Sequence, residues 1–218
     1  MKGETRIFLA DDHPLLREGL RKVIERESWM VIVGEADDGE RALALIEESR
    51  PDVAVLDVEM PKMSGFEVAR AVRERRLPVE IVFLTMHRDE DIFNKALDAG
   101  AKCYVLKDSA VIEIVGCIKA AVKGGHYISP SVSGYLVNRS ARAGALAEQV
   151  PALRDLTETE QRILRLISEY KTSKEIASCL GISYRTVENH RTNISNKLEL
   201  RGSHALLKFA LEHKSELP

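Results

Sequence analysis

The stretch LDVEMPKMSG (residues 56–65) ends an apolar run with a carboxylate and then turns the chain. The run that leads into it, DVAVLD (residues 52–57), has the length and the valine content of a buried strand. Pro61 and Gly65 mark a turn into a helix, with Ser64 as its predicted N-cap. Asp57 therefore stands at a strand tip, where a carboxylate is either a solvated turn residue or a reactive group within reach of a ligand.

Five apolar runs of this kind occur in the first half of the chain, separated by amphipathic segments with apolar residues three and four apart. The last of these segments is expected to bury Ile112, Val115, Ile118 and Val122. Five strands alternating with five helices predict an α/β fold, with a parallel sheet covered on both faces. The strands are expected at RIFLA (6–10), VIVGEA (31–36), DVAVLD (52–57), EIVFLT (80–85) and CYVLK (103–107).

The rest of the chain predicts a second, all-α domain of four helices. The predicted first domain covers residues 1–126, a connecting segment covers 127–154, and the second domain covers 155–218. The small, polar and Ala-rich stretch at 138–155 is expected to be a linker, with room for a weak helical turn. The four helices are expected at 158–170, 174–180, 184–198 and 203–213, and the predicted N-caps of the first three are Thr157, Ser173 and Ser183.

Charge and cysteine content narrow the class of protein. Residues 1–138 have 19 basic and 24 acidic side chains, a net charge of −5, whereas residues 151–218 have 11 and 9, a net charge of +2. The apolar run near the N-terminus is too short for a signal peptide or a membrane span. Three widely spaced cysteines form no metal motif and no complete set of disulfides. We therefore expect a cytoplasmic protein with free thiols and no membrane association.

Polar side chains stand at the ends of four predicted strands. Asp11 and Asp12 follow the first strand, Asp57 ends the third, Thr85 ends the fourth and Lys107 ends the fifth. Ligands of open α/β sheets bind at the carboxyl ends of the strands, so these side chains are expected to converge. Each one alone has an ordinary explanation, such as a solvated strand end or a surface lysine. All five in order at strand tips indicate one site.

This set of side chains suits phosphoryl transfer to a carboxylate. Three neighbouring carboxylates repel each other and require a cation, and hard oxygen ligands with room for water favour Mg²⁺, with Mn²⁺ as the alternative. Asp57 would attack phosphorus and become an acyl phosphate. Lys107 and Thr85 would then hold phosphoryl oxygens.

The motifs LADDH, LDVEMPKMSG, LTMH and YVLK together resemble the receiver domain of two-component response regulators, over roughly residues 5–125. The resemblance implies a flavodoxin-like five-stranded parallel sheet of order 2-1-3-4-5. It also implies that Asp57 is the phosphoacceptor, that Lys107 binds the phosphate, and that Thr85 and Tyr104 form a switch pair. The implied Mg²⁺ ligands are Asp12, Asp57 and the backbone carbonyl of Glu59, with Asp11 acting through water.

The same resemblance implies a phosphohistidine on a sensor histidine kinase as the phosphoryl donor, docking at HPLLREGL (residues 13–20) and nearby loops. One position departs from the family pattern, because Asp108 follows Lys107 where the family often has a proline in a cis bond. A cis bond at a non-proline costs about 3 kcal/mol, so a trans bond is expected. Glu59 and His87 occupy positions that tune phosphate lifetime in this family, in a direction that the sequence leaves open.

The stretch TSKEIASCLGISYRTVENHRTNISNKL (residues 172–198) is typical of a helix-turn-helix. Ala177 lets a crossing helix approach, and Gly181 supplies the turn. The second helix has an inner apolar stripe, and although a polar outer face is commonly just solvated, this one suits base edges and phosphates. The outward residues are Arg185, Asn189, Thr192 and Asn196, and the basic residues around them include Lys174, Arg191 and Lys197.

Residues 155–216 resemble the LuxR-type helix-turn-helix of the NarL/FixJ subfamily. The resemblance implies base contacts by Glu188, Asn189 and Thr192, and backbone contacts by Lys174, Thr186 and Arg191. Glu188 stands where a basic residue is common, which leaves the target sequence open.

We therefore expect a DNA-binding transcription regulator controlled by phosphorylation, with no enzymatic activity beyond its own phosphorylation and dephosphorylation. Phosphorylation of Asp57 is expected to pull Thr85 and Tyr104 inward. This change is expected to free the DNA-binding domain from the receiver, to favour a homodimer on double-stranded DNA, or both, with RNA polymerase as a further partner. Two alternatives remain open: a regulator that binds DNA irrespective of phosphate, and a Mg²⁺-dependent aspartyl phosphohydrolase.

Overall fold

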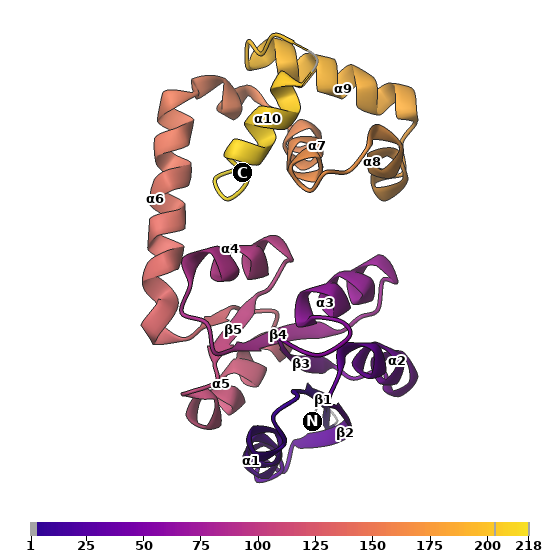
Figure 1. Cartoon of the computed structure of the whole chain (residues 1–218), viewed down its shortest axis with the longest axis vertical. Helices are drawn as coiled ribbons and strands as arrows, with labels where there is room; N and C mark the ends of the chain where they lie inside the picture. The colour runs from indigo at the N-terminus through magenta and orange to yellow at the C-terminus, as the bar shows by residue number, and fades with distance from the viewer. Residues whose placement is uncertain (1–3, 203, 218) are drawn as a thin grey trace. The chain divides into compact units, whose positions relative to one another are not determined.

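The computed structural model describes residues 4–202 and 204–217. The chain divides into two compact units, Met1–Tyr135 and Leu136–Pro218, called here the first and the second unit (Figure 1). Among the described residues, no helix has the length and apolar character needed to cross a membrane. The predicted domain boundaries at 126/127 and 154/155 remain predictions.

The first unit is built on a parallel sheet of order β2-β1-β3-β4-β5-β6, which confirms the expected order of the first five strands. The sixth strand was not expected, because two residues are too short to show an alternating pattern. The strands are β1 (Thr5–Ala10), β2 (Met30–Ala36), β3 (Val53–Asp57), β4 (Glu80–Thr85), β5 (Cys103–Leu106) and β6 (Tyr127–Ile128).

Five helices cover the two faces of this sheet (Figure 1). The apolar residues of α1 (Pro14–Ile24) and α5 (Ala110–Val122) pack on one face. Those of α2 (Gly39–Ser49), α3 (Gly65–Glu74) and α4 (Glu90–Asp98) pack on the other. Five strands alternating with five helices are thus confirmed.

The inward face of α5 differs from the expected one. Ile118 is buried as predicted, but the side chain of Ile112 is 86% exposed. Ile114 and Cys117 are buried instead. Apolar residues occupy several faces of this helix, so their spacing alone did not determine which face packs on the sheet.

The turn after β3 explains the glycine of the LDVEMPKMSG stretch. Ser64 caps α3 as predicted and forms a capping box with Glu67. The backbone N–H of Gly65 donates to the carbonyl of Val58 at 3.1 Å. A Cβ at Gly65 would overlap the carbonyl oxygen of Asp57. The close approach of α3 to the end of β3 therefore requires glycine at this position.

The stretch at 138–155, expected to be a linker with at most a weak helical turn, is helical over most of its length. Helix α6 runs over Ser133–Gln149, and a short 3-10 helix follows at Pro151–Asp155. Alanine has the highest helix propensity, so the alanines of this stretch favour a helix rather than a flexible chain. Tyr135, near the start of α6, packs against the core of the first unit, and Leu146, near its end, belongs to the core of the second.

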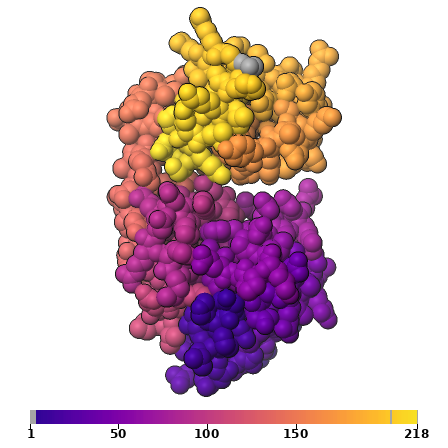
Figure 2. Space-filling model, in the orientation of Figure 1, coloured from indigo at the N-terminus to yellow at the C-terminus, as the bar shows by residue number. Residues whose placement is uncertain are grey.

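The second unit contains the four expected helices, α7 (Glu158–Ser168), α8 (Ser173–Leu180), α9 (Tyr184–Lys197) and α10 (Ala205–Glu212). The predicted start of the last helix, residue 203, lies outside the described residues. Thr157 and Ser183 cap α7 and α9 as predicted. The predicted cap at Ser173 is wrong, because Thr172 forms the capping box with Glu175. Figure 2 shows α8 to α10, orange to yellow, as one continuous surface.

The sixth strand is held by a buried hydroxyl. The side chain of Ser129 is fully buried, and its Oγ accepts from the backbone N–H of Leu106 at 3.1 Å and donates to Glu113. The N–H of Ser129 donates to the carbonyl of Tyr104 at 2.9 Å. These bonds attach the segment that precedes α6 to the edge of β5.

We predict that Ser129→Ala lowers the free energy of unfolding by about 1–3 kcal/mol, because it leaves the buried N–H of Leu106 without an acceptor. Denaturant unfolding measures this change. The exposed Ser131 provides the matched control, since Ser131→Ala removes the same hydroxyl from the same segment. Equal stability of the two variants would contradict the role given to Ser129.

Candidate functional site

The strand register places the polar strand ends next to one another. Ala10 pairs with Leu56, and Asp57 pairs with Leu84. Thr85 pairs with Leu106. Asp11 directly follows Ala10 and Lys107 directly follows Leu106, so both stand at the same edge of the sheet as Asp57 and Thr85. The parallel arrangement therefore gathers side chains that are far apart in the sequence, because all strands end on the same side.

Lys107 lies between two buried carboxylates. Its Nζ is 2.7 Å from Oδ2 of Asp57 and 3.0 Å from Oδ2 of Asp11. All three side chains are 2–4% exposed. Burial by itself lowers the pKa of Lys107, but the bonds to Asp57 and Asp11 outweigh it, so its pKa lies above the usual value and the ammonium stays charged.

The pKa of Asp57 is raised by its surroundings. Burial raises its pKa from 3.8 to about 6, while the bond from Lys107 acts against this rise and the neighbouring Asp11 adds to it. Because the folded-state pKa lies above the unfolded one, ionisation of Asp57 destabilises the fold as the pH rises from 3.8 to about 6. The single ammonium of Lys107 contacts the carboxylates of both Asp57 and Asp11, and a further cation would reduce the repulsion between these carboxylates.

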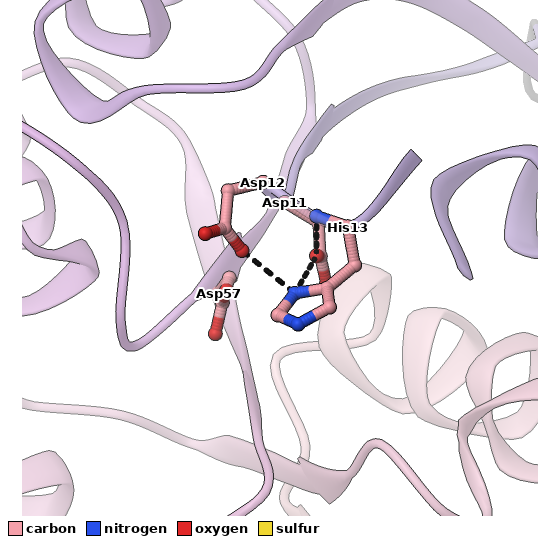
Figure 3. Close-up of side chains that lie close together, drawn as sticks. All are labelled: Asp11, Asp12, His13 and Asp57. Atoms are coloured by element: carbon pink, nitrogen blue, oxygen red, sulfur yellow. Dashed lines mark hydrogen bonds and ion pairs between the residues drawn. The ribbon is translucent and has the colours of Figure 1, made fainter. Parts of the chain in front are cut away.

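Four side chains at this edge form a group that could hold a metal ion. Ligand atoms of Asp11, Asp12, His13 and Asp57 all lie within 4.8 Å of one another. Figure 3 shows them converging from the ends of two strands. The carboxylates are hard oxygen ligands of the kind that divalent cations prefer.

His13 is a member of this group that the sequence reasoning missed. Its Nδ1 lies 2.7 Å from Oδ1 of Asp12 (Figure 3). It also lies 3.3 Å from Nζ of Lys107. Its backbone N–H donates to Oδ1 of Asp11 at 2.8 Å. The histidine follows directly after the two aspartates, and that adjacency was the available signal.

The loop after β4 forms the other side of the site. The backbone N–H of His87 donates to Oγ1 of Thr85 at 3.0 Å, and its Nε2 lies 2.8 Å from Oε1 of Glu59. The backbone N–H of Glu59 in turn donates to Oδ1 of Asp57 at 3.1 Å. The two positions singled out for phosphate lifetime thus contact each other beside the phosphoacceptor candidate.

Tyr104 is already buried in this structure. Its side chain is 1% exposed, and its hydroxyl donates to the carbonyl of His87 at 3.4 Å. Burial raises the pKa of Tyr104 to about 12, so the hydroxyl stays protonated. The expected inward movement of Tyr104 on phosphorylation therefore starts from a position that is already inward.

The peptide bond between Lys107 and Asp108 is trans, as expected, since no cis bond occurs in residues 4–202 or 204–217. Asp108 instead pairs with Arg88, with 3.0 Å between Oδ2 and Nη2. This ion pair joins the loops that follow β4 and β5.

In the second unit, α9 presents the expected polar face. Val187 and Ile194 are buried below it. Four of the predicted DNA contacts are half-buried: Thr186, Glu188, Arg191 and Lys197. Thr186 bonds to Ser183, and Glu188 lies 3.9 Å from Arg191. The four that are exposed are Lys174, Arg185, Asn189 and Thr192.

Lys197 has a structural partner that the sequence did not reveal. Its Nζ lies 2.8 Å from Oε2 of Glu160, which is 3% exposed, and 2.9 Å from the carbonyl of Asp155. Burial raises the pKa of Glu160, but the bonds from Lys197 and Thr157 outweigh it and hold the pKa below its usual value. The ammonium of Lys197 is therefore engaged in the fold of the second unit.

We predict that Lys197→Met lowers the free energy of unfolding of the second unit by about 1–3 kcal/mol, because it leaves Glu160 buried without its cation. The contribution is present above about pH 4.5 and is lost as the pH falls through the lower folded-state pKa of Glu160. Denaturant unfolding at several pH values measures it. Lys174→Met, at an exposed lysine, is the control; equal effects of the two variants would contradict this assignment.

Two protein families match the chain. Residues 7–119 match the response regulator receiver domain, and residues 154–210 match the bacterial regulatory proteins of the luxR family. The first match lies within the first unit and the second match within the second.

Bacterial transcriptional regulatory proteins are similar to this chain over most of its length. The transcriptional regulatory protein MctR of Rhizobium johnstonii is 33% identical over 97% of this chain and 95% of its own length. The transcriptional regulatory protein LiaR of Bacillus subtilis is 36% identical over 89% and 91%. The solved structure of the response regulator RcsB in complex with DNA is 25% identical, has a TM-score of 0.59, and matches 99% of this chain and all of that chain. The chain therefore belongs to the two-component response regulators of the NarL/FixJ type, with a receiver domain followed by a LuxR-type DNA-binding domain.

Proposed function

We propose that Asp57 accepts a phosphoryl group from a phosphohistidine of a sensor histidine kinase and that this modification controls DNA binding. The position of Asp57 supports the proposal, since it is a buried carboxylate at a strand tip with Lys107 at 2.7 Å. An oxygen of Asp57 attacks phosphorus, and the bond from phosphorus to the histidine nitrogen breaks. The product is an acyl phosphate on Asp57 and a neutral histidine on the kinase.

Lys107 has two roles in this proposal. Before transfer it holds Asp57 and offsets the charge of Asp11. After transfer, the ammonium of Lys107 is within reach of an oxygen of the phosphoryl group on Asp57, because it already contacts the carboxylate that receives this group. Thr85 adds a hydroxyl at the same edge of the sheet, as its register with β5 indicates.

The acidic group fits Mg²⁺, with Mn²⁺ as the alternative. Asp12, Asp57 and the backbone carbonyl of Glu59 are the proposed direct ligands, and Asp11 is the proposed ligand through water. The supporting observation is geometric: ligand atoms of Asp11, Asp12, His13 and Asp57 all lie within 4.8 Å of one another. The cation, when bound, neutralises charge on the incoming phosphoryl group. The side chains of this protein orient the nucleophile and, through Lys107, keep it ionised.

The output proposed for this chain is transcription control in the cytoplasm. The exposed face of α9 supplies Asn189, Thr192 and Arg185 for base edges, and Lys174 suits a phosphate. Pairing of two copies on two half-sites would strengthen binding, since the second half-site is then bound at a high effective concentration. RNA polymerase is the further partner proposed at the promoter. Apart from its own phosphorylation and dephosphorylation, no enzymatic turnover is proposed.

We predict that purified protein incubated with a small acyl-phosphate donor and Mg²⁺ gains the mass of one phosphoryl group and that Asp57→Ala abolishes this gain. Intact-mass spectrometry measures it. Asp52→Ala is the matched control, because Asp52 directly precedes the same strand, at its opposite end. An Asp57→Ala variant that still gains one phosphoryl group would remove Asp57 from this role.

We predict that Mg²⁺ affinity falls as the pH decreases through about 6, because protons then compete for the carboxylate of Asp57. Below that value the decrease approaches tenfold per pH unit. Asp12→Asn should weaken binding at neutral pH by at least about tenfold, since it removes a proposed ligand. Calorimetric titration with Mg²⁺ checks both statements, and pH-independent affinity between pH 5 and about 7.5 would contradict the first.

A further inference from the structure

The loop between β4 and α4, residues 86–89, is held by two tyrosine hydroxyls from different elements. The hydroxyl of Tyr104 in β5 donates to the carbonyl of His87 at 3.4 Å. The hydroxyl of Tyr135, the third residue of α6, donates to the next carbonyl, that of Arg88, at 2.6 Å. Two consecutive carbonyls of one loop thus accept hydrogen bonds, one from a tyrosine of the sheet and one from a tyrosine of α6.

The rings of the same two tyrosines contact a shared phenylalanine. Phe93 in α4 is fully buried, and its ring centroid lies 5.2 Å from that of Tyr104, in an edge-to-face arrangement. The same ring also contacts Tyr135, with 5.8 Å between the two ring centroids. Such contacts prefer defined geometries, so a displacement of α4 or of its preceding loop would change the packing of both tyrosines.

The loop is also bonded to the phosphoryl site. The N–H of His87 donates to Oγ1 of Thr85, and the His87 ring contacts Glu59, whose own N–H donates to Asp57. A displacement of the Thr85 side chain toward a phosphoryl group on Asp57 would lengthen the bond that its Oγ1 accepts from the N–H of His87. The carbonyls of His87 and Arg88 would then shift with the backbone of the loop.

The start of α6 is fixed at its other side. The segment before it is attached to β5 through Ser129, and Val132 is 1% exposed within the core. This attachment does not involve the loop at 86–89. The bond from Tyr135 to Arg88 is therefore the contact of α6 that can form or break as the loop moves, while the helix keeps its origin.

We infer that Tyr135 is a positioning residue that couples the phosphorylation state of Asp57 to the first turns of α6 through its hydrogen bond to the carbonyl of Arg88. The inference rests on the proposed phosphorylation of Asp57. The last turn of α6 contributes Leu146 to the core of the second unit, which also contains Val187 and Ile194 of α9, so a change in the stability of this helix reaches the core on which α9 packs.

Tyr135→Phe tests the inference, because it removes the hydroxyl and keeps the ring on Phe93. Tyr127→Phe is the matched control, since Tyr127 stands on the same chain segment but packs on the opposite face of the sheet. Full-length proteins are compared with and without a small acyl-phosphate donor and Mg²⁺. Intact mass reports phosphorylation, and hydrogen exchange of backbone amides in residues 136–142 reports the stability of α6.

In the wild type and in Tyr127→Phe, phosphorylation should change the exchange rates of these amides by about fivefold, the effect expected of one neutral hydrogen bond. In Tyr135→Phe, the same extent of phosphorylation should leave the rates unchanged. A response of Tyr135→Phe equal to that of the wild type would overturn the inference, as would a phosphorylated wild type without any response. Absence of phosphoryl uptake by the wild type would instead show in the mass and would overturn the proposed function, and with it this coupling.

Discussion

The ammonium group of Lys107 lies between the carboxylates of Asp57 and Asp11, and the candidate site of the first unit depends on this contact. Two buried carboxylates in one place repel each other and are costly to desolvate, so they require a cation. The parallel sheet supplies it from a strand tip fifty residues further along the chain than Asp57. The same ammonium offsets only part of the negative charge of Asp11, Asp12 and Asp57, and the group that these carboxylates form with His13 could hold a metal ion.

The strands and the residues at their tips were predictable from the sequence because their signals are local. Apolar runs, periodic helices and a residue at each run's end are visible without a structure. Helix α6 was missed because its alanines also suit a linker, and β6 because two residues show no period. The contacts of Lys197 and Tyr135 were not predictable, since each depends on a partner that is brought near only by the fold, whereas His13 contacts its sequence neighbours Asp11 and Asp12.

The two units have separate apolar cores, and residues of α6 contact the core of each unit. Its start carries Tyr135, which contacts the first core, and its end carries Leu146, which belongs to the second. Tyr104 is buried in this structure. The proposed control by phosphorylation would therefore act mainly through Thr85 and the loop at 86–89, whose backbone contacts Thr85 and both tyrosine hydroxyls.

The central claim is that phosphorylation of Asp57 strengthens DNA binding. The most direct measurement selects duplexes from a random pool with the phosphorylated protein and then titrates a selected duplex with phosphorylated and unphosphorylated protein at one salt concentration. The account predicts that the selected sites contain two half-sites related by symmetry and that the phosphorylated protein binds at least about tenfold more tightly. Equal affinity of the two forms would contradict it and would support a regulator that binds DNA irrespective of phosphate.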